Sequence, residues 1–195
     1  MNTNFLDYVN DMADILRNTV ITDNKGNVLP QEEGMETLID KCNAIAAAKG
    51  LFFFCGNGAS ATMAEHLSHD CFQNAGFLTM TCSETSHITA ISNDIAYAEV
   101  FAYRINRVLC AADMLITISS SGNSPNIIRA VETAREKGAF ITTFSGMKPD
   151  NKSRGMGDIN IYAPAKTYGM VESAHATLLH CWLDLYLDKY MGGRH

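Results

Sequence analysis

A turn near the middle of the chain is rich in side-chain hydroxyls that could bind an anion. Its serines are Ser119, Ser120, Ser121 and Ser124. The turn follows a short apolar run, 115–118, typical of a buried strand, and precedes a predicted helix with Pro125 at its first position. Because the first N–H groups of a helix are unpaired and its N-terminus is electropositive, this turn could hold a phosphate without lysine or arginine. Taken alone, the segment could equally be an ordinary polar turn with Ser124 as a helix cap.

A second turn of the same kind follows the apolar run 51–54. It reads Cys-Gly-Asn-Gly-Ala-Ser at residues 55–60. Its two glycines permit positive φ angles and a close approach of backbone to ligand, and Ser60 could cap the helix that follows. The Gly-x-Gly spacing could also suggest a dinucleotide site, but the usual third glycine is replaced by Ala61.

Titratable side chains recur on the helix predicted for residues 60–74. His66 and Asp70 are four residues apart, so they lie on one face of that helix. An imidazole and a carboxylate placed in this way could bind a divalent metal ion or transfer protons. A hydrogen-bonded pair on a solvated helix face is the alternative.

The last predicted helix, 169–191, carries two further candidates. Glu172 lies near its start, and His180 lies within its apolar stretch. Polar titratable residues at the beginning of a largely buried helix suggest that the helix presents its start to a site. For His180 the alternative is a hydrogen-bonded histidine of the core.

Five short apolar runs alternate with helical segments and predict the strands of one sheet. These runs are 51–54, 77–82, 115–118, 140–144 and 159–162. The alternation predicts an α/β fold, a Rossmann-like three-layer α-β-α sandwich with a five-stranded parallel sheet. Two N-terminal helices, 5–20 and 31–48, precede it, separated by a loop over 22–30. Ligands of such folds bind at the carboxyl ends of the strands, where both turns lie.

Length and composition favour one globular domain. The chain has 195 residues, of which 47% are hydrophobic and 18% charged. We expect a single domain over 1–195, with the N-terminal helices in 1–50 and the α/β core in 51–195. Six cysteines without a Cys-x-x-Cys pair predict small buried thiols rather than disulfides or a thiolate metal site.

Charge argues against several classes of partner. The net charge is −6 and there is no run of lysine or arginine, so we expect neither a nucleic acid nor a membrane as partner. No apolar stretch approaches the roughly 20 residues that span a bilayer, and the N-terminus lacks the pattern of a signal peptide. The expected location is therefore the cytoplasm.

Four motifs in order carry a resemblance to a known family. They are Cys-Gly-Asn-Gly-Ala-Ser at 55–60, Ser-His-Ile followed by Asn-Asp within 86–94, Ile-Ser-Ser-Ser-Gly-Asn-Ser at 118–124, and Ala-Arg-Glu-Lys-Gly at 134–138. Together they resemble the sugar isomerase (SIS) domain family, and within it the phosphoheptose isomerase branch. The match runs from about residue 51 to residue 180, after two N-terminal helices as that branch has.

The resemblance implies a cytoplasmic homotetramer that acts on a phosphorylated sugar. The implied reaction converts sedoheptulose 7-phosphate to D-glycero-D-manno-heptose 7-phosphate through an enediol, for bacterial surface heptose in lipopolysaccharide or capsule. The implied zinc ligands, one ion per site, are His66, Asp70, Glu172 and His180, with Asp70 and His180 also catalytic. The implied substrate-binding residues are Asn57, Gly58, Ser60, Asn93, Asp94, Ser119, Ser120, Ser121, Ser124 and Glu172.

Departures from the family pattern keep other functions open. Asp70 replaces the family's glutamate and Glu172 its glutamine, which should strengthen divalent binding and lower the Lewis acidity of the metal. Asn74 and Gly169 replace an arginine and an aspartate near the pocket. The alternatives are a non-catalytic phosphosugar-binding regulator that acts through a partner protein, and an isomerase of another phosphorylated sugar.

Overall fold

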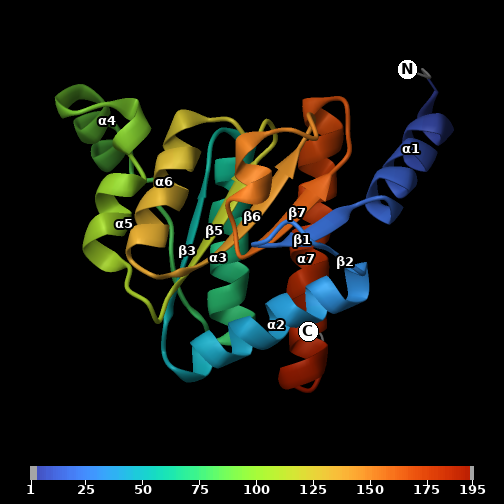
Figure 1. Ribbon diagram of the computed structural model, residues 1–195, viewed down its shortest axis with the longest axis horizontal. Helices are drawn as coiled ribbons and strands as arrows, with labels where there is room; N and C mark the ends of the chain where they lie inside the picture. Colours follow the sequence, from blue (N-terminus) through green and yellow to red (C-terminus); the bar gives the residue numbers. More distant parts are fainter. Residues whose placement is uncertain (1–3, 194–195) are drawn as a thin grey trace.

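A computed structural model describes residues 4–193 as a sheet covered by helices on both faces (Figure 1). The sheet has seven strands in the order β2-β1-β7-β6-β5-β3-β4. The predicted three-layer α/β architecture is confirmed. None of the described helices is long and apolar enough to cross a membrane.

The five predicted parallel strands form the greater part of the sheet. They are β3 (Leu51–Gly56), β4 (Leu78–Met80), β5 (Met114–Ser119), β6 (Phe140–Gly146) and β7 (Ile159–Ala163). From β3 the chain moves outward to β4 and then returns to β5 on the other side of β3. The carboxyl ends of β3 and β5 therefore flank a topological switch point, which is where ligands bind in open parallel sheets.

Two further strands correct the prediction of a five-stranded sheet and of a loop over 22–30. β1 (Val20–Asp23) pairs antiparallel with β7, and β2 (Val28–Leu29) pairs antiparallel with β1. Asp23 closes the turn between them, because its Oδ1 accepts hydrogen bonds from the N–H groups of Lys25 at 2.8 Å and Asn27 at 2.9 Å. The hairpin adds an antiparallel edge to an otherwise parallel sheet.

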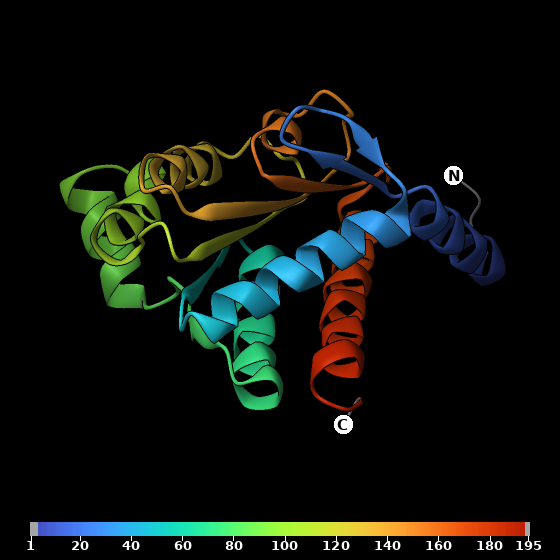
Figure 2. The same cartoon turned by 60° about the horizontal axis from the view of Figure 1, so that its bottom comes forward.

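The helices fall into two layers. The helices are α1 (Phe5–Arg17), α2 (Gln31–Ala47), α3 (Ala59–Ala75), α4 (Thr85–Asp94), α5 (Ala102–Val108), α6 (Pro125–Glu136) and α7 (Tyr168–Tyr190), with short 3-10 turns η1 (Tyr97–Glu99) and η2 (Lys152–Gly155). Figure 2 shows α2, α3 and α7 on one face of the sheet and α4, α5 and α6 on the other, with α1 at the far edge. Both N-terminal helices are therefore confirmed, although the first ends at Arg17 because Val20 begins β1.

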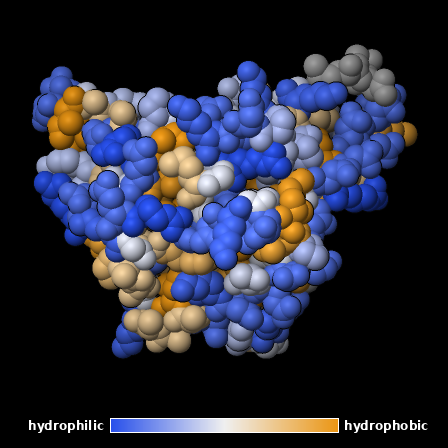
Figure 3. Space-filling model, in the orientation of Figure 1, coloured by the Kyte–Doolittle hydropathy of each residue, from blue (hydrophilic) through white to orange (hydrophobic). Residues whose placement is uncertain are grey.

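Apolar side chains form one core on each face of the sheet. Phe54 and Trp182 are buried between the sheet and α7, with ring centroids 6.4 Å apart. Leu115 and Ile127 are buried on the opposite face, against α6. The outer face seen in Figure 3 is mainly hydrophilic, with apolar side chains exposed in patches.

The cysteines bear out the predicted burial only in part. Those buried are Cys42, Cys55, Cys71 and Cys82. Cys110 and Cys181 are exposed, contrary to the prediction. Cys110 lies in the segment between α5 and β5, and Cys181 lies on α7.

Helices α3 and α7 pack side by side and carry all four predicted metal ligands. α3 begins after Gly58, whose φ of 57° lies in the left-handed region that glycine tolerates. The predicted cap by Ser60 is wrong, because Gly58 is the N-cap residue and Ser60 lies inside the first turn. α6 begins as predicted, with Ser124 at the N-cap position and Pro125 as the first residue.

Candidate functional site

A polar pocket of about 120 Å³ lies at the carboxyl ends of β3 and β5. Its lining residues are Asn57, Ser60, Ile118, Ser119, Ser120, Ser121, Ser124, Tyr168 and Glu172. All four serines of the central turn therefore face one cavity, together with two residues of the glycine-containing turn. We call this cavity the serine pocket.

Hydroxyl groups in the serine pocket remain available to a ligand. Ser120 is only 6% exposed, and its Oγ has no hydrogen-bond partner within residues 4–193. Ser124 makes no side-chain capping bond to α6 although it occupies the N-cap position. Because buried hydroxyls are normally hydrogen-bonded, the Ser120 hydroxyl is available to bond with a ligand in this pocket.

The segment between β6 and β7 supports the turn 119–124, which we call the serine turn. The peptide carbonyl of Gly122 accepts a hydrogen bond from the N–H of Ser153 at 2.9 Å. Asn151, which is 5% exposed, packs so closely on Gly122 that a Cβ at that glycine would lie 1.9 Å from its Oδ1. Gly122 also has a φ of 62°, so glycine is required both by backbone conformation and by space.

Three of the predicted metal ligands come together between α3 and α7. One ligand atom from each of His66, Asp70 and His180 lies within 4.8 Å of the others. The His66 Nε2 is 3.3 Å from Asp70 Oδ2, and the rings of His66 and His180 are 5.2 Å apart between centroids. Two imidazoles and a carboxylate on two rigid helices are a donor set that suits zinc and leaves a coordination position open.

Glu172 lies apart from these three residues. It lines the serine pocket and is not part of the group formed by His66, Asp70 and His180. Glu172 and His180 are eight residues apart on the same helix, which separates them by about 12 Å along its axis. Within one chain, Glu172 therefore lies at the serine pocket, whereas Asp70 lies with His66 and His180 at another position along the α3–α7 pair.

The remaining candidates are placed unequally. Asn57 and Ser60 line the serine pocket, whereas Gly58 lines a neighbouring pocket of about 190 Å³ that also includes Asn57. Asn93 and Asp94 lie at the end of α4, where the Asn93 Nδ2 donates to the Asp94 Oδ1 at 2.8 Å. Neither of these two lines the serine pocket.

Other histidines take structural roles. His175 is fully buried between α7 and the sheet, and its Nε2 lies 3.0 Å from the carbonyl oxygen of Ser145. Burial lowers the pKa of His175 to about 4, so the ring is neutral at physiological pH. His87 bonds similarly, with its Nε2 2.9 Å from the carbonyl oxygen of Val100. Each ring therefore fixes a segment of the fold.

Three residues near the site were not identified from the sequence. Tyr168, the first residue of α7, lines the serine pocket and is 59% exposed. Tyr97 and Asn126 both hydrogen-bond to Asn57 at the edge of that pocket. Only Asn126 had a local signal, because it lies two residues after Ser124 in the predicted turn of the helix.

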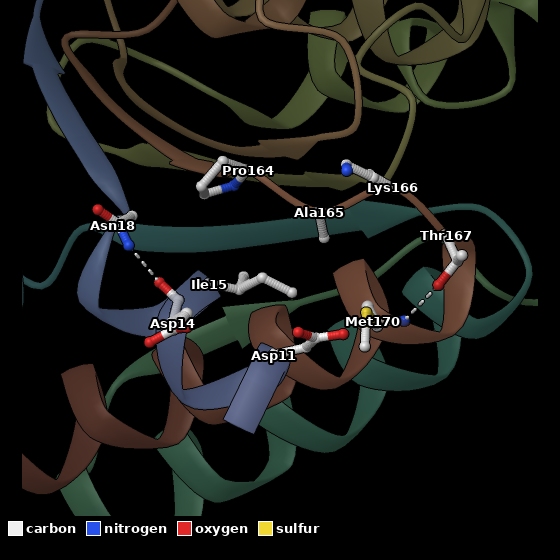
Figure 4. Close-up of a pocket in the computed structure, with 9 residues that line it drawn as sticks. All are labelled: Asp11, Asp14, Ile15, Asn18, Pro164, Ala165, Lys166, Thr167 and Met170. Atoms are coloured by element: carbon white, nitrogen blue, oxygen red, sulfur yellow. Dashed lines mark hydrogen bonds between the residues drawn. The ribbon is translucent and has the colours of Figure 1, made fainter. Parts of the chain in front are cut away.

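A larger cavity lies elsewhere, beneath α1. It has a volume of about 410 Å³ and is bounded by α1 and the segment that joins β7 to α7 (Figure 4). Asp11 and Asp14 line it on one side and Lys166 on the other. No residue predicted for the site lines this cavity.

Comparisons with known proteins identify the family of this chain. The sequence model described as "SIS domain" matches residues 7–146. A phosphoheptose isomerase of Sodalis glossinidius is 33% identical over 174 residues, which cover 85% of this chain and 89% of that protein. One of Yersinia enterocolitica is 32% identical over 189 residues, which cover 94% of each. The phosphoheptose isomerase GmhA from Neisseria gonorrhoeae superposes with a TM-score of 0.75 at 25% identity, covering 92% of this chain and 97% of that one.

Proposed function

The chain belongs to the SIS domain family and, within it, to the phosphoheptose isomerases, and from this we propose how its site acts. It is a phosphosugar aldose–ketose isomerase, and its reaction converts sedoheptulose 7-phosphate to D-glycero-D-manno-heptose 7-phosphate. The observation that carries our proposal is the buried Ser120 hydroxyl without a partner among residues 4–193, which lines the serine pocket. In this role the chain would contribute to heptose synthesis for the bacterial surface.

The serine pocket holds the phosphate of the substrate in this proposal. Hydroxyls of the turn and the unpaired N–H groups at the start of α6 donate to the phosphate oxygens. The positive end of the helix dipole adds to this attraction without any cationic side chain. Because the phosphate is remote from the carbons that react, its binding energy serves to position them.

The group His66, Asp70 and His180 is proposed as the metal and catalytic centre. These residues would hold a divalent ion such as zinc, with Glu172 as a further ligand only if it comes from a second copy of the chain. The ion would polarise the carbonyl of the sugar and so stabilise negative charge on its oxygen. Water or the substrate would occupy the coordination position that these three residues leave open.

Proton transfer is assigned to Asp70 and His180. Isomerisation requires a base to remove the acidic C–H next to the carbonyl, which gives a cis-enediol, and a second group to move a proton at the oxygen. The Asp70 carboxylate has two oxygens, of which Oδ2 faces His66, so the other can act as the base. His180 approaches from α7 and would carry the proton to and from the oxygen.

We also propose that the protein is a cytoplasmic homotetramer. Support comes from α1, which presents a row of apolar side chains to solvent in the single chain. Phe5 is 77% exposed, Leu6 is 69% exposed and Val9 is 45% exposed. A second copy packed on this face would cover them.

The reaction can be followed directly by NMR. The purified protein, loaded with Zn²⁺, is incubated with sedoheptulose 7-phosphate, and we expect the signals of the aldose 7-phosphate to grow. His66→Ala, which removes a metal ligand but none of the serine pocket, should abolish turnover and retain binding of inorganic phosphate. Absence of turnover by the metal-loaded wild type would refute the assignment of substrate.

A different phosphorylated sugar is a second candidate substrate. Glu172 places a carboxylate in the serine pocket, where it can accept hydrogen bonds from sugar hydroxyls next to the phosphate. A panel of ketose phosphates of different chain length distinguishes the candidates by their kcat/KM values. A protein that binds these sugars without converting any of them would instead be the non-catalytic regulator.

A further inference from the structure

Asn126 is a buried amide at the start of α6 whose position the helix itself does not explain. It is the second residue of α6 and is 1% exposed. The N-cap residue Ser124 makes no side-chain capping bond to the helix, and the side-chain hydrogen bonds of Asn126 lead away from it to Asn57. Because a buried carboxamide is costly unless it is hydrogen-bonded, its partners elsewhere indicate its role.

Those partners belong to the other turn of the site. The Asn126 Nδ2 donates to Asn57 Oδ1 at 2.8 Å, and the Asn57 Nδ2 donates to Asn126 Oδ1 at 2.9 Å. This reciprocal pair joins residues 69 positions apart in the sequence. It bridges the segments that follow β5 and β3, so the two turns that line the serine pocket are tied to each other.

Tyr97 adds a third bond to the same pair. Its hydroxyl donates to Asn57 Oδ1 at 2.9 Å, so that oxygen accepts from both Tyr97 and Asn126. The 3-10 turn that carries Tyr97 is itself held against α6, since the Arg129 Nε donates to Glu99 Oε1 at 2.9 Å. The amide of Asn57 is therefore fixed from two sides.

These hydrogen bonds limit how the side chain of Asn57 can bind a ligand. Its Oδ1 already accepts two hydrogen bonds, and its Nδ2 already donates one. The adjoining Gly58 starts α3 without a side-chain cap, so the path of this turn depends on the contacts of Asn57. The side chain of Asn57 thus holds the turn that lines the serine pocket.

We propose that Asn126 is a positioning residue that, through Asn57, sets the spacing of the two turns for the phosphate of the substrate. The proposal rests on the proposed function only in taking the serine pocket as a phosphate site. It assigns Asn126 no contact with the reacting carbons, because the group His66, Asp70 and His180 lies further along α3 and α7.

Affinity for inorganic phosphate tests this role without requiring turnover. Isothermal titration of Asn126→Ala with inorganic phosphate should give affinity about tenfold below that of wild type, since a preorganised hydrogen-bond network is lost. With the sugar substrate, KM should rise by a similar factor while kcat stays near the wild-type value. Asn57→Ala combined with Asn126→Ala should be little worse than either alone, because both remove one interaction.

Asn160→Ala is the matched control for general destabilisation. Asn160 is also a fully buried amide, and its Oδ1 accepts bonds from Gly157 N at 2.7 Å and Thr143 Oγ1 at 2.8 Å, away from the serine pocket. We expect this variant to melt at a lower temperature and to bind phosphate within about twofold of wild type. Equal losses of phosphate affinity in the Asn126 and Asn160 variants would overturn the proposal.

A milder variant covers the case in which Asn126→Ala does not fold. Tyr97→Phe removes one hydroxyl at a side chain that is 54% exposed, and it should weaken phosphate binding about two- to threefold. Unchanged phosphate affinity in the folded variants would overturn the inference, as would a wild type that binds no phosphate. A wild type that binds phosphate without isomerising the sugar would contradict the proposed function alone.

Discussion

The buried imidazole of His175 makes the stability of the fold sensitive to acid. The folded protein holds the pKa of this ring at about 4, because burial opposes its charged form, whereas the unfolded chain protonates it near the ordinary value of 6.5. The unfolded state therefore takes up the proton first as the pH falls. The contribution of this residue is intact above about pH 6.5 and is lost progressively toward about pH 4.

The size of this effect follows from the difference between the two pKa values. A difference of about 2.5 units corresponds to about 3 kcal/mol of unfolding free energy. His175→Gln is the comparison, since its amide N–H can replace the bond to the carbonyl of Ser145 and does not titrate. Urea denaturation of both proteins between about pH 7 and about pH 4 gives their difference, in which the titration of other groups cancels.

We expect wild type to lose about 3 kcal/mol relative to His175→Gln over this pH range. The measurement also tests where the ring lies, because an accessible imidazole would protonate with little effect on folding. Parallel pH profiles for the two proteins would show that His175 is not buried as a neutral side chain, and the reasoning would be wrong.

Three further predictions concern the site. Gly122→Ala should destabilise the fold by about 2 kcal/mol or more and reduce phosphate affinity, because a Cβ there meets Asn151; urea titration and calorimetry measure both, and a neutral result would contradict the close packing. Ser120→Ala should weaken inorganic phosphate binding about tenfold with little loss of stability, since its hydroxyl has no partner within residues 4–193; calorimetry that finds unaltered affinity would exclude this hydroxyl from the anion site. Asp70→Asn should lower zinc content, measured by atomic absorption, and abolish turnover while phosphate affinity stays near that of wild type; full metal occupancy would remove Asp70 from the ligand set.

Local signals in the sequence were sufficient for the parts of the site that lie on one segment. The start of α6 at Pro125 follows from local chemistry, and the shared face of His66 and Asp70 follows from their spacing on a helix. The approach of His180 to that pair depends on the packing of α7 against α3, which periodicity does not specify. The grouping of His180 with His66 and Asp70 was predicted only from the family resemblance.

Other features depend on contacts between distant segments or on strands too short to recognise. β1 and β2 have four and two residues, and their pairing with β7 and with each other is non-local. The bond between Asn57 and Asn126 leaves no pattern in the sequence for the same reason. The predicted zinc ligands included both Glu172 and His180, although eight residues on one helix separate these two by about 12 Å along its axis.

The support of the serine turn by the segment between β6 and β7 bears on how this protein can be engineered. A peptide tag inserted in the exposed hairpin turn after Asp23 would project from the edge of the sheet and leave the site unaltered. The same insertion next to Asn151 would displace Gly122 and with it the backbone of the turn that lines the serine pocket. Libraries that seek new substrates could therefore diversify Tyr168 at the rim and keep this second segment at its native length.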